Sequence, residues 1–383
     1  MNLAFPIATY HDRVAGVRAE LERRGLDGVV VTLPDAIHWL TGFDTIGYLW
    51  SQSVVIDLND DEPVLHTRTT EEPGVLATTW LTTAKYYDIA TQDPTAELAD
   101  TLRDRGLANG RLGVDLRSFA FLPAQREQLA ELLPEVEWVD TTDLVAELRL
   151  VKTPLELAYQ RQAAAIADAA MNATLAALRP GVSEVEMAGL AAAALGAAGS
   201  EYAAIPPMVS SGPRSAMVHA MASRRVIGQG DVICVELGAS VHRYHAIVMR
   251  TAVIGAPPAR VSAVYDCARR GMEAALEASK PGAAAHEPDD ACNAVLDELD
   301  LVRRRCHRIG YSIGVAYPPG WLEPMMLVAG DEHVLGPGMS FSLEPNLALA
   351  DEGFGIKVGE TVLCTEDGAE RLSAVDLELF EVR

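Results

Sequence analysis

The segment GQGDVICVELGASVHRYHAIVMRTAVI, residues 228–254, decides the fold class of this chain. It contains two strand-like apolar runs, Val232 to Leu237 and Ile247 to Ile254. Gly228-Gln-Gly-Asp precedes the first run, and Val241-His-Arg-Tyr separates the two, and both have the composition of turns. The segment therefore predicts strands joined by a short turn.

Two helices are predicted before this segment and two after it. Thr153 and Pro154 suit the N-cap and the first position of a helix over 155–178, because proline lacks an N–H that would be unsatisfied there. Ser183 and Glu186 have the spacing of a capping box for a helix that ends at Gly199. Helical periodicity returns at 259–279 and 286–300. Strand-like runs lie at 203–209, 339–343 and 354–364. This order predicts an α+β domain.

The N-terminal part has a different pattern. Strand-like runs at 28–33, 53–57 and 111–115 alternate with helix-period segments at 9–24, 95–106 and 117–133, which predicts an α/β domain with a mixed or parallel sheet. A chain of 383 residues exceeds what one hydrophobic core usually serves. We therefore expect a smaller N-terminal domain at 1–151 and a larger C-terminal domain at 152–383.

Composition excludes several classes of partner. The formal charge of −23 repels phosphate backbones and anionic lipids, so nucleic acid and membrane surfaces are not expected partners. The first residues lack the pattern of a signal peptide, and no apolar stretch reaches the roughly 20 residues that span a bilayer, which favours a cytoplasmic protein. The five cysteines form no CxxC pair, and no glycine-rich phosphate motif occurs. No cofactor is expected.

Short blocks in the C-terminal half carry a resemblance to a known family: Pro206–Pro213, His219, Gly230–Ala239, Tyr244 with Arg250-Thr251, Gly310–Gly314, Gly338–Pro345 and Gly355–Leu363. In this order they resemble the pita-bread family of aminopeptidase P, prolidase, methionine aminopeptidase and creatinase. Trp39–Asp44 resembles the N-terminal domain of creatinase and prolidase more weakly. The resemblance implies a pita-bread C-terminal domain preceded by a creatinase-type N-terminal domain.

Peptidases of this family hold two divalent metal ions with five side chains, and most of those positions are changed here. Glu236 replaces the first aspartate, and Glu344 stands unchanged. Ile247, Tyr311 and Gly359 occupy the positions of the second aspartate, the histidine and the last glutamate. Two carboxylates cannot hold two bridged ions, so we expect no metal. Glu360 neighbours a lost ligand position, but adjacent strand side chains point to opposite faces.

The resemblance implies that His219, Glu236 and Glu344 are the catalytic residues. His219 matches the histidine that moves protons in the family, and imidazole titrates near neutrality without a metal. Glu236 and Glu344 would form a paired-carboxylate site that polarises water, binds a cation or attacks an electrophilic carbon. The structural alternatives are a satisfied histidine after a Gly-Pro turn, and two carboxylates in a hydrogen-bond network.

Further residues are candidates for substrate binding. Tyr311 donates a hydrogen bond from the vacated ligand position in this hypothesis, and Arg68 clamps a substrate carboxylate in the site of a neighbouring subunit, as in creatinase. Surface charge is the alternative for Arg68, and core packing is the alternative for the aromatic residues. The full set is Tyr311, Arg68, Trp39, Phe43, Trp321, Tyr244 and Glu360.

Two branches of the family lack the metals, namely creatinase and the ectoine hydrolases, and residues 236–251 and 310–321 resemble the latter most. Met249 stands where creatinase has a substrate-binding glutamate, which argues against creatine. The first hypothesis is therefore a metal-independent hydrolase of a C–N bond in a small amidine, guanidino or cyclic amino acid derivative, zwitterionic or cationic. An Xaa-Pro dipeptidase with a degenerate metal site and a non-catalytic binding module are the alternatives. The resemblance also implies a homodimer.

Overall fold

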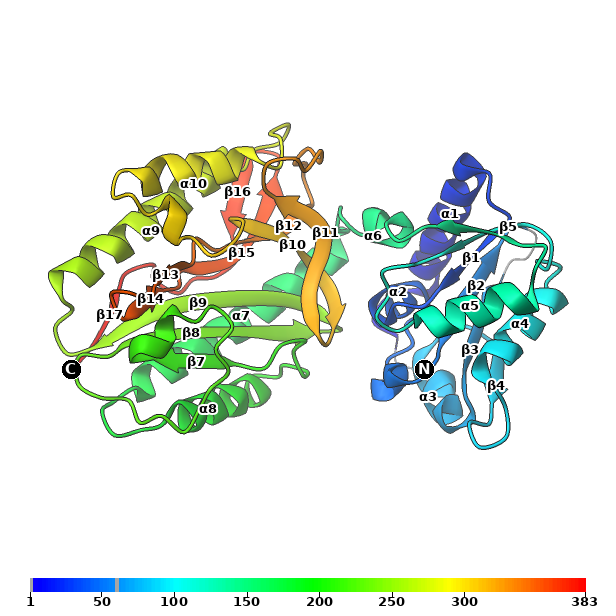
Figure 1. The fold of residues 1–383 in the computed structure, drawn as a ribbon, viewed down its shortest axis with the longest axis horizontal. Helices are drawn as coiled ribbons and strands as arrows, with labels where there is room; N and C mark the ends of the chain where they lie inside the picture. The colour runs from blue at the N-terminus through cyan, green and yellow to red at the C-terminus, as the bar shows by residue number, and fades with distance from the viewer. Residues whose placement is uncertain (1–2, 59–61) are drawn as a thin grey trace. The chain divides into compact units, whose positions relative to one another are not determined.

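The computed structural model describes residues 3–58 and 62–383, which form two compact units. The units divide between Arg149 and Leu150, whereas the sequence analysis placed the division between 151 and 152. Each unit has its own sheet and its own hydrophobic core (Figure 1). Among the described residues, no helix is both long enough and apolar enough to cross a membrane.

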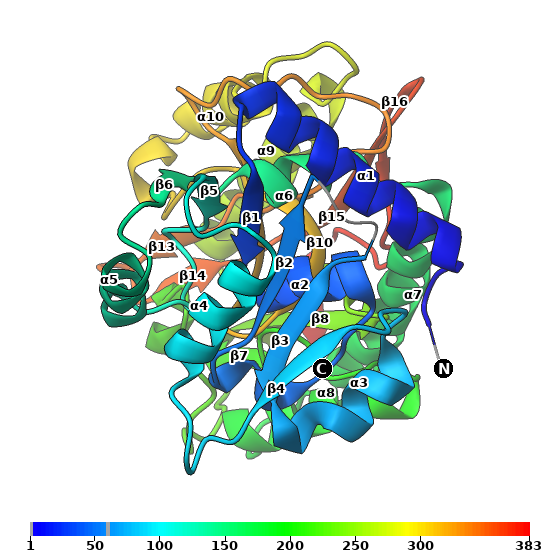
Figure 2. The ribbon, with the colours of Figure 1, turned by 90° about the vertical axis from the view of Figure 1, so that its right-hand side faces the viewer.

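The first unit is built on a six-stranded mixed sheet in the order β4-β3-β2-β1-β5-β6. The pairs β1–β2 and β2–β3 are antiparallel, and β1–β5, β3–β4 and β5–β6 are parallel. Figure 2 shows β1 to β4 side by side. The strands are β1 (Gly28–Val31), β2 (Ser53–Asp57), β3 (Val64–Arg68), β4 (Ala84–Tyr87), β5 (Arg111–Val114) and β6 (Glu137–Asp140).

The two edge strands, β4 and β6, were not predicted, because their partly exposed sequences AKYY and EWVD contain no apolar run. The central strands contribute buried valines and leucines, which pack against α4 and α5 in one core. The helices of this unit are α1 (Ile7–Arg24), α2 (Pro34–Thr41), α3 (Glu72–Thr78), α4 (Pro94–Asp104), α5 (Pro123–Leu132) and α6 (Leu144–Leu148), with 3-10 turns η1 (Ile46–Leu49) and η2 (Thr69–Glu71).

The second unit contains a curved sheet whose main path runs β11-β10-β12-β15-β9-β8-β7. Strand β16 pairs with β15, and β17 pairs with β9. Strands β13 (Leu347–Leu349) and β14 (Phe354–Ile356) form a separate pair. The main strands are β7 (Met208–Ser211), β8 (Val232–Val241), β9 (Tyr244–Ile254), β10 (Gly310–Tyr317), β11 (Gly320–Leu327), β12 (Ser340–Leu343), β15 (Gly359–Thr365), β16 (Gly368–Arg371) and β17 (Phe380–Val382).

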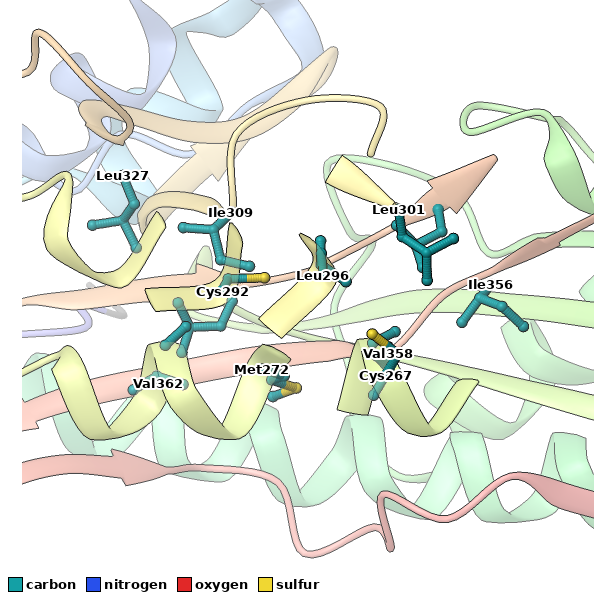
Figure 3. Packing of buried hydrophobic residues seen from close by; sticks show 14 of the residues in the cluster. Cys267, Met272, Cys292, Leu296, Leu301, Ile309, Leu327, Ile356, Val358 and Val362 are labelled. Carbon is teal, nitrogen blue, oxygen red and sulfur yellow. The ribbon is translucent and has the colours of Figure 1, made fainter. Parts of the chain in front are cut away.

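Two pairs of helices pack against this sheet. Helices α7 (Pro154–Ala177) and α8 (Glu184–Ala197) pack on one face of β8 and β9 (Figure 1). Helices α9 (Ala259–Ala278) and α10 (Glu287–Asp297) pack together over a second core, where Cys267, Met272, Cys292 and Leu296 meet strand residues such as Val362 (Figure 3). The 3-10 turns are η3 (Gly212–Ala216) and η4 (Val302–Arg304). This is the predicted α+β order.

Local signals account for several element boundaries. Thr153 is the N-cap of α7 and Ser183 forms a capping box with Glu186 at the start of α8, both as predicted. Thr153 also forms a capping box with Glu156, which was not predicted. The strand expected at 203–209 begins only at Met208, after two prolines. The hairpin of β10 and β11 was not predicted as paired strands, although the residues 310–314 were recognised as a motif.

The turn between β8 and β9 has the two-residue form that the sequence indicated. His242 and Arg243 have φ values of 48° and 65°, the left-handed conformation that a tight hairpin turn requires at both central positions. The buried Arg243 side chain donates to Ser240 Oγ at 2.9 Å and stacks over the Tyr202 ring at 3.9 Å. This turn fixes the register in which Glu236 lies opposite Met249.

Candidate active site

The fold turns Glu236 away from α7 and α8. Ile233, Val235 and Leu237 on β8 pack in the core that these helices cover. Because successive strand side chains alternate, Glu236 projects from the other face. There it lines a cavity of about 420 Å³ in the second unit. The lining residues are Ile205, Val218, His219, Glu236, Cys306, His307, Arg308, Tyr311, Trp321, Leu322, Glu344 and Asn346.

The cavity brings together the three residues that the sequence analysis proposed as catalytic, His219, Glu236 and Glu344. Glu344 follows β12, and its backbone N–H donates to the carbonyl oxygen of Ile309 at 2.7 Å. The side chains of Glu236 and Glu344 are 5% and 3% exposed. Burial, and next to it the negative charge of Glu236, raise the pKa of Glu344 well above its usual range. The two carboxyl groups therefore differ in protonation, and Glu344 is the one that keeps its proton.

Lys357 neutralises the other carboxylate. Its buried ammonium group forms an ion pair with Glu236 Oε2 and donates to the carbonyl oxygen of Val218 at 2.6 Å. Burial lowers the pKa of Lys357, but the charge of Glu236 and the hydrogen bond to it act in the opposite direction, and the pKa is raised overall. Sequence reasoning missed this residue. A lysine between Ile356 and Val358 in an apolar run was the available signal, because a buried lysine requires a partner.

A second histidine, His307, also lines the cavity and was missed. Its Nδ1 lies 2.7 Å from the carbonyl oxygen of Arg308 and 4.0 Å from Glu344 Oε1. Burial lowers the pKa of His307, and the positive charges of Arg308, His219 and Lys357 act in the same direction. In the neutral ring Nδ1 carries the proton, since a carbonyl can only accept, and Nε2 is left as a proton acceptor. His219 is exposed at the cavity wall.

Tyr311 and Trp321 form an apolar wall with one polar contact. Trp321 Nε1 donates to Tyr311 Oη at 2.9 Å, and both side chains are buried. They pack in one cluster with Ile247, Met249 and Ile313. Burial is the main cause that raises the pKa of Tyr311 well above its usual range, and the charge of Glu236 acts in the same direction. Tyr311 is therefore a neutral phenol.

The donor set does not fit a pair of divalent metal ions. Ile247, at the position of the second aspartate, belongs to the apolar cluster and has no donor atom. A Cβ atom on Gly359 would lie 2.8 Å from Leu343 O and 2.9 Å from Glu344 Cβ, so a glutamate there requires a backbone shift. The ammonium group of Lys357 already pairs with Glu236. Among residues 3–58 and 62–383, no three His, Cys, Asp or Glu side chains are arranged to hold a metal ion.

Two of the predicted substrate-binding residues do not line the cavity. Glu360 is fully buried, and Arg250 Nη2 binds its Oε2 at 2.7 Å while Arg371 takes the other oxygen. Strand alternation places it on the face opposite to the one where a ligand from position 359 would project. Tyr244 Oη donates to Glu156 Oε1 at 2.6 Å. Both side chains thus have structural contacts elsewhere in the second unit.

The remaining candidates, Arg68, Trp39 and Phe43, belong to the first unit. Trp39 and Phe43 are 6% and 2% exposed, and Trp39 stacks with the guanidinium group of Arg13 at 4.7 Å. Arg68 Nη2 pairs with Glu71 Oε1 at 2.5 Å. The aromatic residues have the core positions that the sequence analysis gave as the alternative. The proposed role of Arg68, which is to clamp a substrate carboxylate in the site of a neighbouring subunit, stays a prediction.

Comparison with known proteins covers both units. The description of metallopeptidase family M24 matches residues 158–366, and that of the creatinase/prolidase N-terminal domain matches residues 13–151. The ectoine hydrolase of Halomonas elongata is 32% identical over 398 residues, which cover 99% of each chain. The Xaa-Pro dipeptidase of Pyrococcus furiosus is 31% identical over 244 residues, which cover 64% of this chain and 69% of that one.

Solved structures agree in fold. The dipeptidase PepE from Mycobacterium ulcerans matches with a TM-score of 0.84 at 28% identity and covers 99% of both chains. A prolidase from Thermococcus sibiricus matches with a TM-score of 0.89, covering 97% of this chain and 99% of that one, and at 22% identity it shows the fold alone. Together with the family matches, these likenesses confirm the predicted pair of domains, a creatinase-type N-terminal domain and a pita-bread domain.

Proposed function

Because this chain belongs to metallopeptidase family M24, we propose that it hydrolyses a C–N bond in a small amidine, guanidino or cyclic amino acid derivative and does so without a bound metal. An ectoine-type cyclic amidine is the first substrate to test, given the full-length likeness to an ectoine hydrolase. One observation carries the proposal: a buried lysine pairs with Glu236 in a site whose donor set does not fit a divalent ion.

The chemistry follows from the unlike states of the two carboxyl groups. A cationic amidinium already has an electrophilic carbon, so a Lewis acid is not required to activate it. Glu236, held as a carboxylate by Lys357, deprotonates the water that attacks this carbon, or attacks the carbon itself to form a covalent adduct that water then hydrolyses to free Glu236. Glu344, which keeps its proton, donates it to the departing nitrogen. His307 Nε2 accepts a proton within the cavity, and the exposed His219 exchanges it with solvent.

The test is a substrate panel of ectoine, creatine, cyclic amides and Xaa-Pro dipeptides, incubated with and without a chelator. We expect ring opening of a cyclic amidine that the chelator leaves unchanged, in protein that metal analysis finds free of stoichiometric manganese and zinc. Glu236→Gln and Glu344→Gln should each abolish turnover. His286→Ala is the matched control for His219→Ala, since His286 is an exposed histidine that pairs with Asp290 on α10.

Chelator-sensitive cleavage of Xaa-Pro dipeptides by metal-loaded protein would overturn the proposal in favour of the second candidate, a dipeptidase. The full-length likeness to the PepE dipeptidase at 28% identity is the observation that favours this candidate. An unchanged ligand affinity in Glu236→Gln, with no turnover of any compound by the parent protein, would indicate the third possibility, a binding module. Intact-mass analysis of quenched reactions distinguishes the two possible roles of Glu236, nucleophile and general base, since direct attack leaves a covalent adduct on the protein.

A further inference from the structure

Two polar side chains of the cavity have hydrogen-bonding atoms with no partner in the protein. Within residues 3–58 and 62–383, the buried Nε of Arg308 and the buried Oδ1 of Asn346 accept or donate no hydrogen bond. Buried polar atoms are almost always satisfied by protein, water or a bound molecule. No other residue that lines this cavity has such an unpaired buried atom. A donor and an acceptor left open in one cavity point to a ligand that supplies both complements.

Arg308 has a guanidinium group that is positioned but not neutralised. Its Cζ lies 4.8 Å from the centre of the Tyr311 ring, a cation–π contact between two residues that line the cavity. Arg308 takes part in none of the ion pairs formed among the described residues. Lys357 is paired with Glu236, so the ammonium group of the cavity already has a partner. The guanidinium group of Arg308 is thus left without an ion-pair partner beside its unbonded Nε, and an anionic group fits it.

Asn346 supplies the complementary acceptor. Its side chain is 2% exposed, and its Nδ2 lies 3.6 Å from the sulfur of Met249, which leaves Oδ1 directed away from that contact. The backbone N–H of Asn346 donates to the carbonyl oxygen of Glu344 at 2.7 Å, and both residues line the cavity. The group that fits the open Oδ1 of Asn346 is an N–H of a ligand in this cavity.

We propose that Arg308 binds the carboxylate of the substrate and that Asn346 accepts a hydrogen bond from its N–H. This inference rests on the proposed function and narrows its substrate class to amidine or cyclic derivatives that keep a free carboxylate. Arginine suits a carboxylate because its planar donors match the two oxygens. The carboxylate-binding group then comes from the same chain as Glu236, in addition to any contribution of Arg68 from another subunit.

The direct test requires no turnover. The Nε–H resonance of Arg308, assigned through its loss in Arg308→Met, should shift when acetate is added at millimolar concentration. Acetamide, which has the same shape without the charge, should leave it in place. Arg303→Met is the matched control, because Arg303 is an exposed arginine nearby in η4 and its removal changes the net charge equally. An acetate titration that leaves the Arg308 resonance unmoved would overturn the assignment.

Calorimetric binding of ectoine and of its carboxamide extends the test to the full ligand. Arg308→Met should weaken ectoine binding by about 10- to 100-fold, as expected for a charged hydrogen bond, and should leave carboxamide binding unchanged. Arg308→Lys should recover part of the loss. Asn346→Leu should weaken both ligands by the same factor, because both have the N–H. Equal losses for the two ligands in Arg308→Met would contradict the proposal.

The outcomes separate this inference from the proposed function. Arg308-dependent binding of ectoine without hydrolysis would retain the carboxylate site and reject the reaction. Hydrolysis that is insensitive to Arg308→Met, with no discrimination between ectoine and its carboxamide, would retain the reaction and reject the site.

Discussion

Replacing Glu344 with glutamine should make the protein more stable, and increasingly so as the pH rises. The folded-state pKa of Glu344 is raised, chiefly by burial and then by the charge of Glu236. Its contribution to stability is therefore fully present below the unfolded-state pKa of about 4.3 and is lost as the pH rises through the folded-state pKa. Glutamine resembles the protonated acid and has no proton to lose.

The magnitude follows from a single titrating group. Between the two pKa values the unfolded chain releases one proton that the folded chain keeps, which costs the parent protein about 1.4 kcal/mol per pH unit. Relative to the parent, Glu344→Gln should thus gain about 2.7 kcal/mol between pH 5 and pH 7, provided that Glu344 stays protonated over that interval. The gain at neutral pH comes with the loss of turnover, since the proposed acid is gone.

Urea unfolding followed by fluorescence at unit pH steps from about pH 5 to about pH 8 measures this difference. Glu332→Gln is the control, because Glu332 is exposed in the same unit. We expect the control to differ from the parent by a small amount that does not vary with pH. A constant difference for Glu344→Gln across the same range would show that Glu344 ionises in the folded protein as it does in water, and the assignment of acid and base roles would fail.

Four further predictions concern other residues of the second unit. Lys357→Met should lower the free energy of unfolding by about 3–5 kcal/mol, because it leaves the carboxylate of Glu236 buried and unpaired; a loss below about 1 kcal/mol in urea melts would contradict the ion pair. Glu360→Gln should lower the melting temperature through its two arginine partners without changing KM, whereas a raised KM would place it at the substrate. Gly359→Glu restores one metal ligand of the family peptidases. It should lower the melting temperature, since a Cβ atom at 359 meets Leu343 O at 2.8 Å, and elemental analysis should find no stoichiometric manganese. A stable variant that binds metal would refute this prediction. His242→Asn should raise stability by about 0.5–1 kcal/mol, as asparagine tolerates a positive φ better, and a decrease would assign His242 a larger packing role against Tyr159.

Local chemistry explains which elements the sequence predicted. The capping boxes of α7 and α8 and the two-residue turn after β8 each depend on residues within four positions of one another, so they are readable without a fold. The edge strands β4 and β6 lack an apolar run, because most of their residues are partly exposed at the edges of the sheet. Their strand structure depends on pairing with the sheet, which the local sequence does not encode.

The resemblance to the pita-bread family identified the vacated metal positions in the sequence, and a ligand needs a donor atom whatever the fold. Ile247 and Gly359 have none, and the structure adds the reasons that they cannot be repaired simply: Ile247 is packed in an apolar cluster, and Gly359 is crowded by backbone. Glu360 was a nearby carboxylate, and the alternation of side chains along β15 directs it to two arginines.

Two domains were predicted from strand runs, helix caps and turns, because these are properties of single residues and their near neighbours. The missing ligands and the pair Glu236 and Glu344 were identified through the resemblance of the sequence to the pita-bread family. The tertiary structure alone decided what surrounds that pair. Lys357 is 121 positions from Glu236, and Arg308 and Asn346 come from different segments that the sheet brings to one cavity. The chemical state of a buried charged group depends on the groups that it contacts, and in this site those groups come together only in the folded sheet.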